Sequence, residues 1–149
     1  MAMPKAAQQW ITTDKGRHLR GRVRTGTQPE LALRRALFAR GWRFRVNHLI
    51  TPGCRPDVAF TRLRIAVFVD GCFWHSCPEH GRSAFDGPNA ALWEAKMIRN
   101  AAADARANRE AGEHGWRVFR TWECQVGEQG LRELLIELES ARRLADSQA

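Results

Sequence analysis

The sequence predicts an α/β fold in which a mixed β-sheet is flanked by helices. Short apolar or alternating segments, typical of strands, are bounded by turn residues. Longer segments with helical periodicity lie before, between and after them, without internal repeats or low-complexity stretches. At 149 residues the chain is long enough for one domain with one hydrophobic core.

The chain begins with a basic arm, which we place at residues 1–26, and continues as a single domain over residues 27–149. Residues 15–26 are so rich in glycine and arginine that no stable isolated helix is expected there. We therefore expect the arm to be partly disordered until it binds a partner.

The first helix is predicted to begin at Thr27 or Gln28, near its N-cap. Pro29 is tolerated in the first turn, and the helix dipole favours Glu30 at the same end. Gly41 is expected to end the helix. Its inward face is formed by residues at helical spacing, Leu33, Ala36, Leu37 and Arg40.

Strands are predicted next over residues 42–46, 57–60 and 64–69. The third segment is almost entirely apolar, which is typical of a strand buried on both faces in the middle of a sheet. The middle of the predicted sheet therefore leads directly into the cysteine-containing segment that follows.

The second half of the chain alternates helix and strand again. Asn89 is expected to cap a long helix over residues 90–114, which two glycines stop. A strand over residues 116–122 follows. The last element is an amphipathic helix over residues 131–144, with Leu134, Leu135 and Leu138 facing inward.

The charge of the chain indicates a nucleic-acid partner. The formal net charge is +8, and all but three of the 24 basic residues are arginines. Because a guanidinium group binds phosphate in a bidentate manner, DNA or RNA is the leading inference, and a solvated basic surface is the alternative.

No segment predicts export or a membrane partner. Residues 1–10 lack the apolar run of a signal peptide, and no segment reaches the length of a membrane span. We expect a cytoplasmic protein whose cysteines are reduced, which favours metal binding over disulfides.

Residues 69–81 contain donors for a metal ion. Cys72 and Cys77 are followed by His80, and Cys124 lies far downstream, so the four form a Cys3His set suited to structural zinc. Such a zinc ion would tie the loop to a distant strand. His75 is a competing fifth donor, and buried free thiols are the alternative to metal binding. The remaining cysteine, in residues 52–56, has no nearby partner in the sequence and is expected to be an unliganded turn residue.

Two carboxylates are predicted at the ends of neighbouring strands. Asp57 begins one strand and Asp70 ends the next, so they could hold a hard cation such as Mg²⁺ together with backbone oxygens. His75 is close enough in sequence to act as a base. Metal-dependent cleavage of a phosphodiester needs this combination of cation and base.

Five motifs follow the basic arm between Thr27 and Cys124: Thr-x-Pro-Glu, Pro-Gly-x-Arg-Pro-Asp, Val-Phe-Val-Asp-Gly-Cys-Phe-Trp-His, Lys-x-x-x-Asn-x-x-x-Asp and Gly-Trp-Arg-Val-x-x-x-Trp-Glu-Cys. Together with the arm they resemble the very-short-patch-repair (Vsr) DNA mismatch endonucleases. The resemblance implies a restriction-endonuclease-like fold of the PD-(D/E)xK type. It also implies a magnesium-dependent nick on the 5′ side of the thymine in a T·G mismatch, the lesion left when 5-methylcytosine deaminates.

The resemblance also implies roles for individual residues. Asp57 and the backbone carbonyl of Val69 would bind the catalytic Mg²⁺. His75 would act as general base or position the water, and Glu30 would support the site from its helix. Asp70 stands where the well-known form of the family has a second histidine, so it joins the predicted catalytic set.

Zinc and DNA contacts follow from the same resemblance. Cys72, Cys77, His80 and Cys124 look like the structural zinc set. Phe73 and Trp74, which we expect to be exposed, look like a wedge that enters the base stack beside the mismatch. The full set of expected DNA-binding residues is Leu19, Arg20, Phe73, Trp74, Lys96 and Asn100.

The expected partner is double-stranded DNA with a T·G mismatch, bound by a monomer in the bacterial cytoplasm at the nucleoid, with downstream repair proteins as further partners. Two other functions stay open. One is a zinc-bearing DNA-binding protein without catalysis, which would not need Asp57 and His75. The other is a restriction-type nuclease on the same fold.

Overall fold

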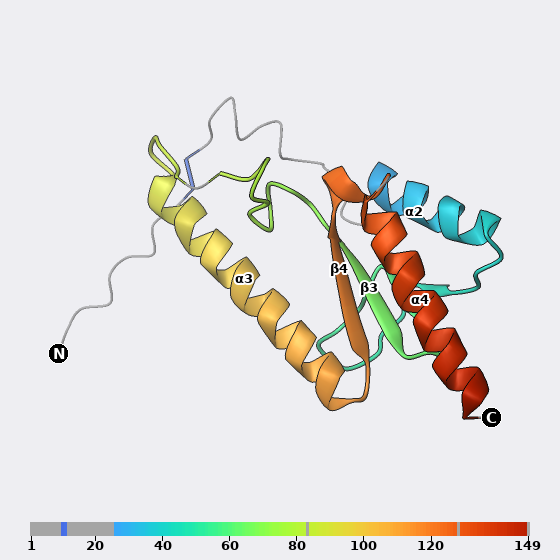
Figure 1. Cartoon of the computed structure of the whole chain (residues 1–149). Helices are drawn as coiled ribbons and strands as arrows, with labels where there is room; N and C mark the ends of the chain where they lie inside the picture. The colour runs from blue at the N-terminus through green and yellow to red at the C-terminus, as the bar shows by residue number, and fades with distance from the viewer. Residues whose placement is uncertain (1–9, 12–25, 83, 128, 149) are drawn as a thin grey trace.

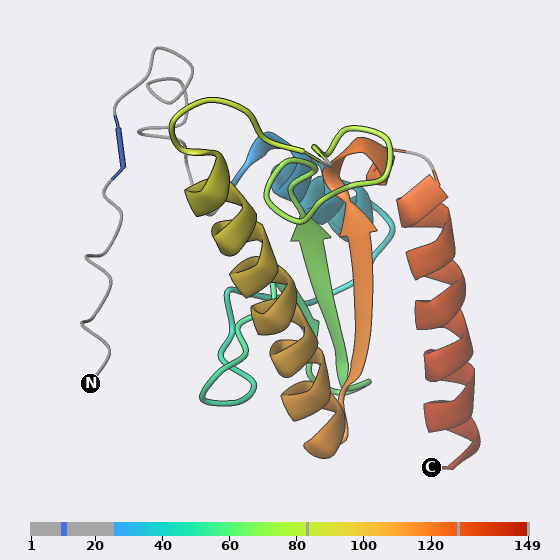
Figure 2. The ribbon, with the colours of Figure 1, turned by 90° about the vertical axis from the view of Figure 1, so that its left-hand side faces the viewer.

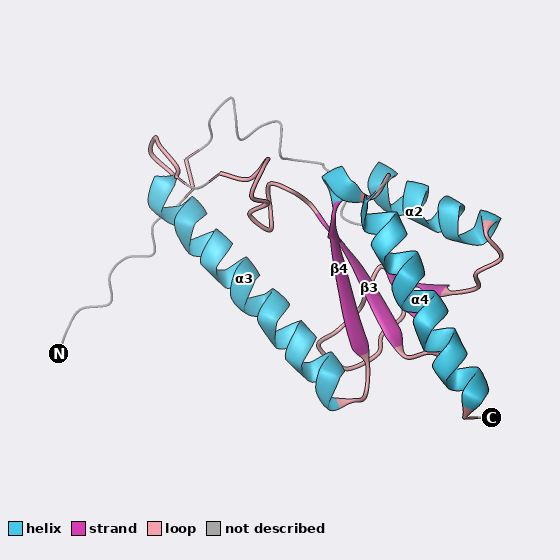
Figure 3. Ribbon diagram, in the orientation of Figure 1, coloured by secondary structure: helices cyan, strands magenta, loops and turns pink. Residues whose placement is uncertain are grey.

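The computed structural model of the chain describes residues 10–11, 26–82, 84–127 and 129–148. Within them the predicted order of helices and strands is confirmed (Figures 1 and 3). The elements are α2 (Gln28–Ala39), β1 (Arg45–Val46), β2 (Val58–Phe60), β3 (Ile65–Asp70), α3 (Ala90–Glu113), β4 (Arg117–Trp122), the 3₁₀ turn η1 (Glu123–Gln125) and α4 (Gln129–Ser147). None of the described helices combines the length and apolar character that crossing a bilayer requires.

The four strands form one mixed sheet in the order β1-β2-β3-β4. β2 pairs antiparallel with both β1 and β3, whereas β3 and β4 are parallel and are joined through α3. β3 is therefore central, as its apolar sequence predicts. Helices α2 and α4 cover one side of the sheet and α3 covers the other (Figure 1).

The hydrophobic core lies between the sheet and the α2–α4 side. Leu37 of α2, Val67 of β3 and Leu134 and Leu138 of α4 are fully buried. Each such side chain contributes about 1.5–3 kcal/mol when it leaves water, so this layer supplies most of the fold's cohesion. Leu135, predicted to face inward, is only partly buried, because the buried residues of α4 follow a different helical stripe.

Two details of the first half differ from the prediction. The strand predicted over residues 42–46 is reduced to Arg45–Val46, which pair with Ala59 and Val58 of β2. Phe44 instead packs its ring on Phe60, with centroids 6.0 Å apart. Arg40, predicted on the inward face of α2, is exposed at the C-cap of that helix.

Asn89 occupies the N-cap position of α3, as predicted, but its side chain makes no capping hydrogen bond. The Asn89 amide instead brackets the backbone of Ile11: it accepts a hydrogen bond from Ile11 N (2.8 Å) and donates one to Ile11 O (2.6 Å). Trp10 packs edge-on against Trp93, with centroids 4.9 Å apart. Residues 10–11 are thus tied to the start of α3.

Candidate functional site

Helix α3 faces the sheet mainly with polar side chains, and Ala111 is its only buried residue. Polar residues four positions apart lie on one stripe that faces the loop after β3 and strand β4. They are Lys96, Asn100, Asp104 and Asn108. The sequence predicts the first three of these as one stripe. That stripe forms one wall of the candidate site, and Figure 2 shows the helix that carries it running alongside β3 and β4.

His75 lies in the loop after β3 and contacts two carboxylates. Its Nδ1 is 2.5 Å from Asp104 Oδ2 on α3 and 3.9 Å from Asp70 Oδ1 at the end of β3. The potential ligand atoms of these three residues lie within 4.8 Å of one another. With Nδ1–H donated to a carboxylate, Nε2 is the ring nitrogen that can accept a proton.

Asp70 is buried and paired with a residue that sequence reasoning missed. Arg120 of β4 donates from one terminal nitrogen to Asp70 Oδ1 at 2.8 Å. Burial raises the pKa of Asp70, while Arg120 and His75 oppose that rise. Arg120 is one of many arginines, and only the pairing register, which sets it beside Phe68 in the neighbouring strand, singles it out.

Asp57 lies immediately before β2, where its Oδ2 accepts a hydrogen bond from Val69 N at 2.7 Å. Burial, together with the nearby carboxylates of Glu30 and Asp70, raises the pKa of Asp57 to about 6 in spite of this hydrogen bond. Arg34 is the neighbouring cation that opposes the rise. A carboxylate left short of positive charge in this way has the character of a site for a hard cation.

Glu30 reaches the same region from the first turn of α2, as predicted. Its side chain is buried, accepts a hydrogen bond from Gly26 N at 2.7 Å and lies 3.6 Å from the Arg34 guanidinium. Arg34 also donates to the backbone carbonyl of Asp57 at 3.0 Å. Arg34 therefore connects the helix to the start of β2.

The raised pKa gives a prediction for the protein without divalent cations. Because the pKa of Asp57 is about 6 when folded and 3.8 otherwise, folding takes up a proton between these values. The contribution of this group to stability is therefore full below about pH 4 and is lost as the pH rises through 6. Relative to Asp57→Asn, the wild type should lose about 1.4 kcal/mol between pH 5 and pH 7.5 in urea unfolding. A constant difference would show that Asp57 is already ionised at pH 5.

The predicted zinc donors come together in a second group. The donor atoms of Cys72, Cys77, His80 and Cys124 all lie within 4.8 Å of one another. Cys77 Sγ is 3.8 Å from Cys124 Sγ and 3.9 Å from His80 Nδ1. His75, the competing donor, points to Asp104 instead.

These spacings fit a tetrahedral zinc ion. Two sulfurs bound at about 2.3 Å in a tetrahedron are about 3.8 Å apart, far beyond the length of a disulfide. Although burial raises the pKa of the Cys77 thiol, hydrogen bonds from the backbone of His80 and Glu79 outweigh it and lower the pKa to about 7. The Cys77 thiolate is thus accessible near neutral pH, whereas burial raises the pKa of Cys72 to about 12, so that zinc would have to displace the proton of that thiol. Cys54 lies outside this group. It is buried, and its backbone forms an isolated antiparallel β-bridge with Thr51.

Phe73 and Trp74 are half-buried, so the expectation that both are exposed is wrong. They belong to an aromatic cluster at the start of α3, with centroids 5.3 Å and 5.9 Å from Trp93. Lys96 Nζ lies 4.9 Å from the centroid of the Trp74 ring, and Asn100 donates to the Trp74 carbonyl at 2.9 Å. The predicted helix residues therefore support this loop. Leu19 and Arg20 lie outside the residues that the structure describes.

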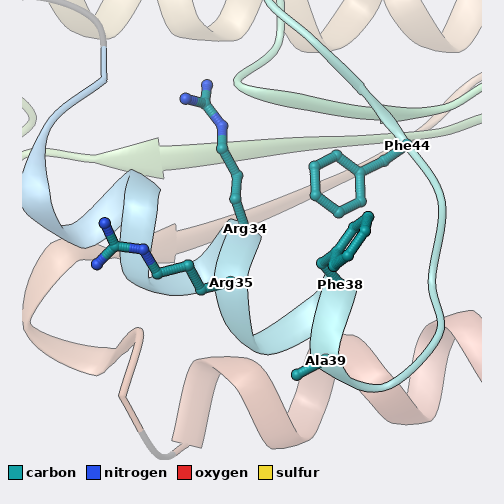
Figure 4. Close-up of a pocket in the computed structure, with 5 residues that line it drawn as sticks. All are labelled: Arg34, Arg35, Phe38, Ala39 and Phe44. Carbon is teal, nitrogen blue, oxygen red and sulfur yellow. The ribbon is translucent and has the colours of Figure 1, made fainter.

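A pocket of about 340 Å³ lies on the outer flank of α2 and does not coincide with either group. Figure 4 shows Phe38 and Phe44 facing each other there, while the guanidinium groups of Arg34 and Arg35 extend away from them. The pocket is open and apolar, and no predicted catalytic or metal-binding residue lines it.

Several known proteins are similar in sequence to this chain. Residues 12–79 match the family described as DNA mismatch endonuclease Vsr. The type II nicking enzyme V.NaeI of Lentzea aerocolonigenes is 42% identical over 76% of this chain and 69% of its own. V.XorIIP of Xanthomonas oryzae pv. oryzae, also a type II nicking enzyme, is 36% identical over 83% and 90%, and the DNA mismatch endonuclease Vsr of Escherichia coli is 33% identical over 75% and 70%. Because these relatives are matched over more than two thirds of their length, the chain belongs to the Vsr family and is a DNA endonuclease.

Proposed function

We propose that this protein is a Mg²⁺-dependent endonuclease that nicks one DNA strand on the 5′ side of the thymine at T·G mismatches arising from deaminated 5-methylcytosine. The observation that carries the proposal is His75, held by Asp104 beside Asp70 at the end of the sheet where Asp57 lies. We further propose that the sheet is of the PD-(D/E)xK type and that the enzyme acts as a cytoplasmic monomer on duplex DNA.

The reaction needs a base and a cation, and both have candidate residues. Asp57, with the Val69 carbonyl, would hold Mg²⁺, which stabilises the charge that develops on the phosphate. His75 takes the proton of the attacking water at Nε2, since Nδ1 donates to Asp104. Glu30 supports the start of β2 through Arg34, which bonds the backbone of Asp57.

DNA recognition would use two features: the part of the loop after β3 that carries Phe73 and Trp74, called the aromatic loop below, and the polar stripe of α3. Phe73 and Trp74 sit on Trp93 and are only half-buried, so part of each ring stays accessible. Insertion beside a base pair costs least at a mismatch, which would favour damaged sites. Lys96 and Asn100 lie next to this loop and would contact phosphate, as would Arg20, with Leu19 entering from the other groove.

We also propose one structural zinc ion per chain, held by Cys72, Cys77, His80 and Cys124. Cys124→Ser is expected to lose both the zinc and thermal stability, because it cuts the connection between the loop after β3 and the end of β4. Cys54→Ala, at a buried thiol outside the group, is the matched control and should keep its zinc. Elemental analysis of protein purified without chelators measures the metal, and its absence from the wild type would refute the site.

A second candidate function is that of a restriction-type nuclease, which would nick DNA at a fully matched site. Several relatives are named type II nicking enzymes, which favours this function. A third candidate function is DNA binding without cleavage. Binding alone does not require a histidine paired with a carboxylate, so the contact between His75 and Asp104 argues against it.

One experiment separates these functions. A duplex with one T·G pair and its matched counterpart are labelled on each strand in turn and incubated with the protein, with Mg²⁺ or with a chelator. The proposal requires a nick 5′ of the mismatched thymine, in that strand and only with Mg²⁺. Equal nicking of the matched duplex would favour the restriction-type nuclease, and binding of both duplexes without any nick would favour the non-catalytic protein.

A further inference from the structure

Arg120 of β4 contacts residues of β3 and α3 on several sides of the candidate site. Its side chain is largely buried, and its guanidinium carbon lies 4.1 Å from the centroid of the Phe68 ring. The parallel register of β3 and β4 pairs these two residues directly. From this platform Nε donates to Asn108 Oδ1 of α3 at 2.8 Å. The guanidinium is therefore held in one plane by both the sheet and the helix.

The same guanidinium contacts both carboxylates that lie beside His75, those of Asp70 and Asp104. One terminal nitrogen donates to Asp70 Oδ1 at 2.8 Å and lies 3.6 Å from Asp104 Oδ1. Those carboxylates lie 3.9 Å and 2.5 Å from His75 Nδ1. The position of the His75 ring thus depends on two acids whose own positions depend on Arg120.

The charges of this group argue against a second metal ion there. Asp70, His75 and Asp104 have donor atoms close enough to share a cation. However, Arg120 already donates to Asp70 Oδ1 and lies beside Asp104 Oδ1, and its fixed positive charge would repel a divalent ion at that distance. The guanidinium itself neutralises the pair of acids.

We infer that Arg120 is a positioning residue for DNA cleavage: it holds Asp70 and Asp104 so that the His75 ring stays oriented toward the scissile phosphate. This inference rests on the proposed role of His75. A lysine cannot replace Arg120 fully, because an ammonium has neither the planar fork that bonds Asn108 and Asp70 together nor the same stacking on Phe68.

The test measures single-turnover nicking and DNA affinity for a set of variants. Arg120→Gln should slow nicking by about 10–100-fold, the usual effect of removing a group that orients a reactive one, with heteroduplex affinity changed less than about twofold. Arg120→Lys, which retains the charge beside buried Asp70 and so protects folding, should still be slower by about tenfold. Arg117→Gln is the matched control, on the same strand but in an exposed ion pair with Glu137, and should nick like the wild type.

A double-mutant cycle with His75→Ala distinguishes positioning from general support of the fold. If Arg120 acts through His75, Arg120→Gln should change the residual rate of the His75→Ala protein by less than about twofold. An undiminished effect in that background, a wild-type rate in Arg120→Lys, or a loss of DNA affinity that matches the loss of rate would each overturn the inference.

Failure of the proposed function and failure of the role of Arg120 would give different results. The proposed function is tested by which duplex the wild type nicks, whereas Arg120 is tested by the ratio of variant to wild-type rates on whichever DNA is nicked. Divalent cation binding provides a further check. Mn²⁺ bound by the Asp57→Asn protein and lost on adding Asp104→Asn would show a metal ion in the group and overturn the inference.

Discussion

The Asp57→Ala variant is expected to lose nicking by about a thousandfold or more while it still binds the heteroduplex. Asp57 is the proposed principal ligand of a cation that stabilises the charged phosphate, so its removal takes away several kcal/mol of transition-state stabilisation. Each 1.36 kcal/mol of stabilisation lost slows the reaction about tenfold. The carboxylate is buried and accepts a hydrogen bond from Val69 N, whereas Phe73 and Trp74 pack against Trp93 of α3. Its loss should therefore leave the DNA contacts in place.

The measurement combines nicking of a labelled T·G duplex with a binding titration on the same DNA. Asp146→Ala is the matched control, because Asp146 is exposed on α4 in an ion pair with Arg62 and should not affect either readout. Cleavage retained by Asp57→Ala would move the catalytic cation away from β2 and refute the assignment of Asp57 as its principal ligand.

Substitutions of the two loop histidines are expected to have opposite effects. His75→Ala should slow nicking by about 10²–10⁴-fold, the range of a general base, and keep its zinc. His80→Ala should lower zinc affinity and thermal stability first, because its Nδ1 lies 3.9 Å from Cys77 Sγ. His75 instead bonds Asp104 on α3.

Zinc content, melting temperature and nicking rate, measured on both variants, decide the matter. His114→Ala serves as the control, since His114 is exposed at the C-cap of α3, at the far end of that helix from the aromatic loop. If His75→Ala released zinc and His80→Ala were silent, the ligands would be Cys72, His75, Cys77 and Cys124. The base would then have to be sought among Asp70, Glu30 or a metal-bound water.

Local sequence patterns were sufficient for most of the fold. The long helix was predicted over residues 90–114 and is observed as Ala90–Glu113, because helical periodicity and the glycines after it are local signals. The prediction was wrong where a residue's environment is set by a distant partner. The side chain of Asn89 bonds Ile11 instead of the first turn of the helix, and the strand predicted over residues 42–46 is reduced to the two residues that pair with β2.

The sequence by itself determined the family, the order of the elements and the donors available for metal ions, because these depend on residue type and spacing along the chain. Only the tertiary structure decided which histidine joins which group: His80 lies with the thiols and His75 with Asp104. It also singled out Arg120, through the register of β3 and β4. Periodicity fixes the face on which a side chain lies, whereas the pairing of strands and the packing of α3 fix which side chain it meets.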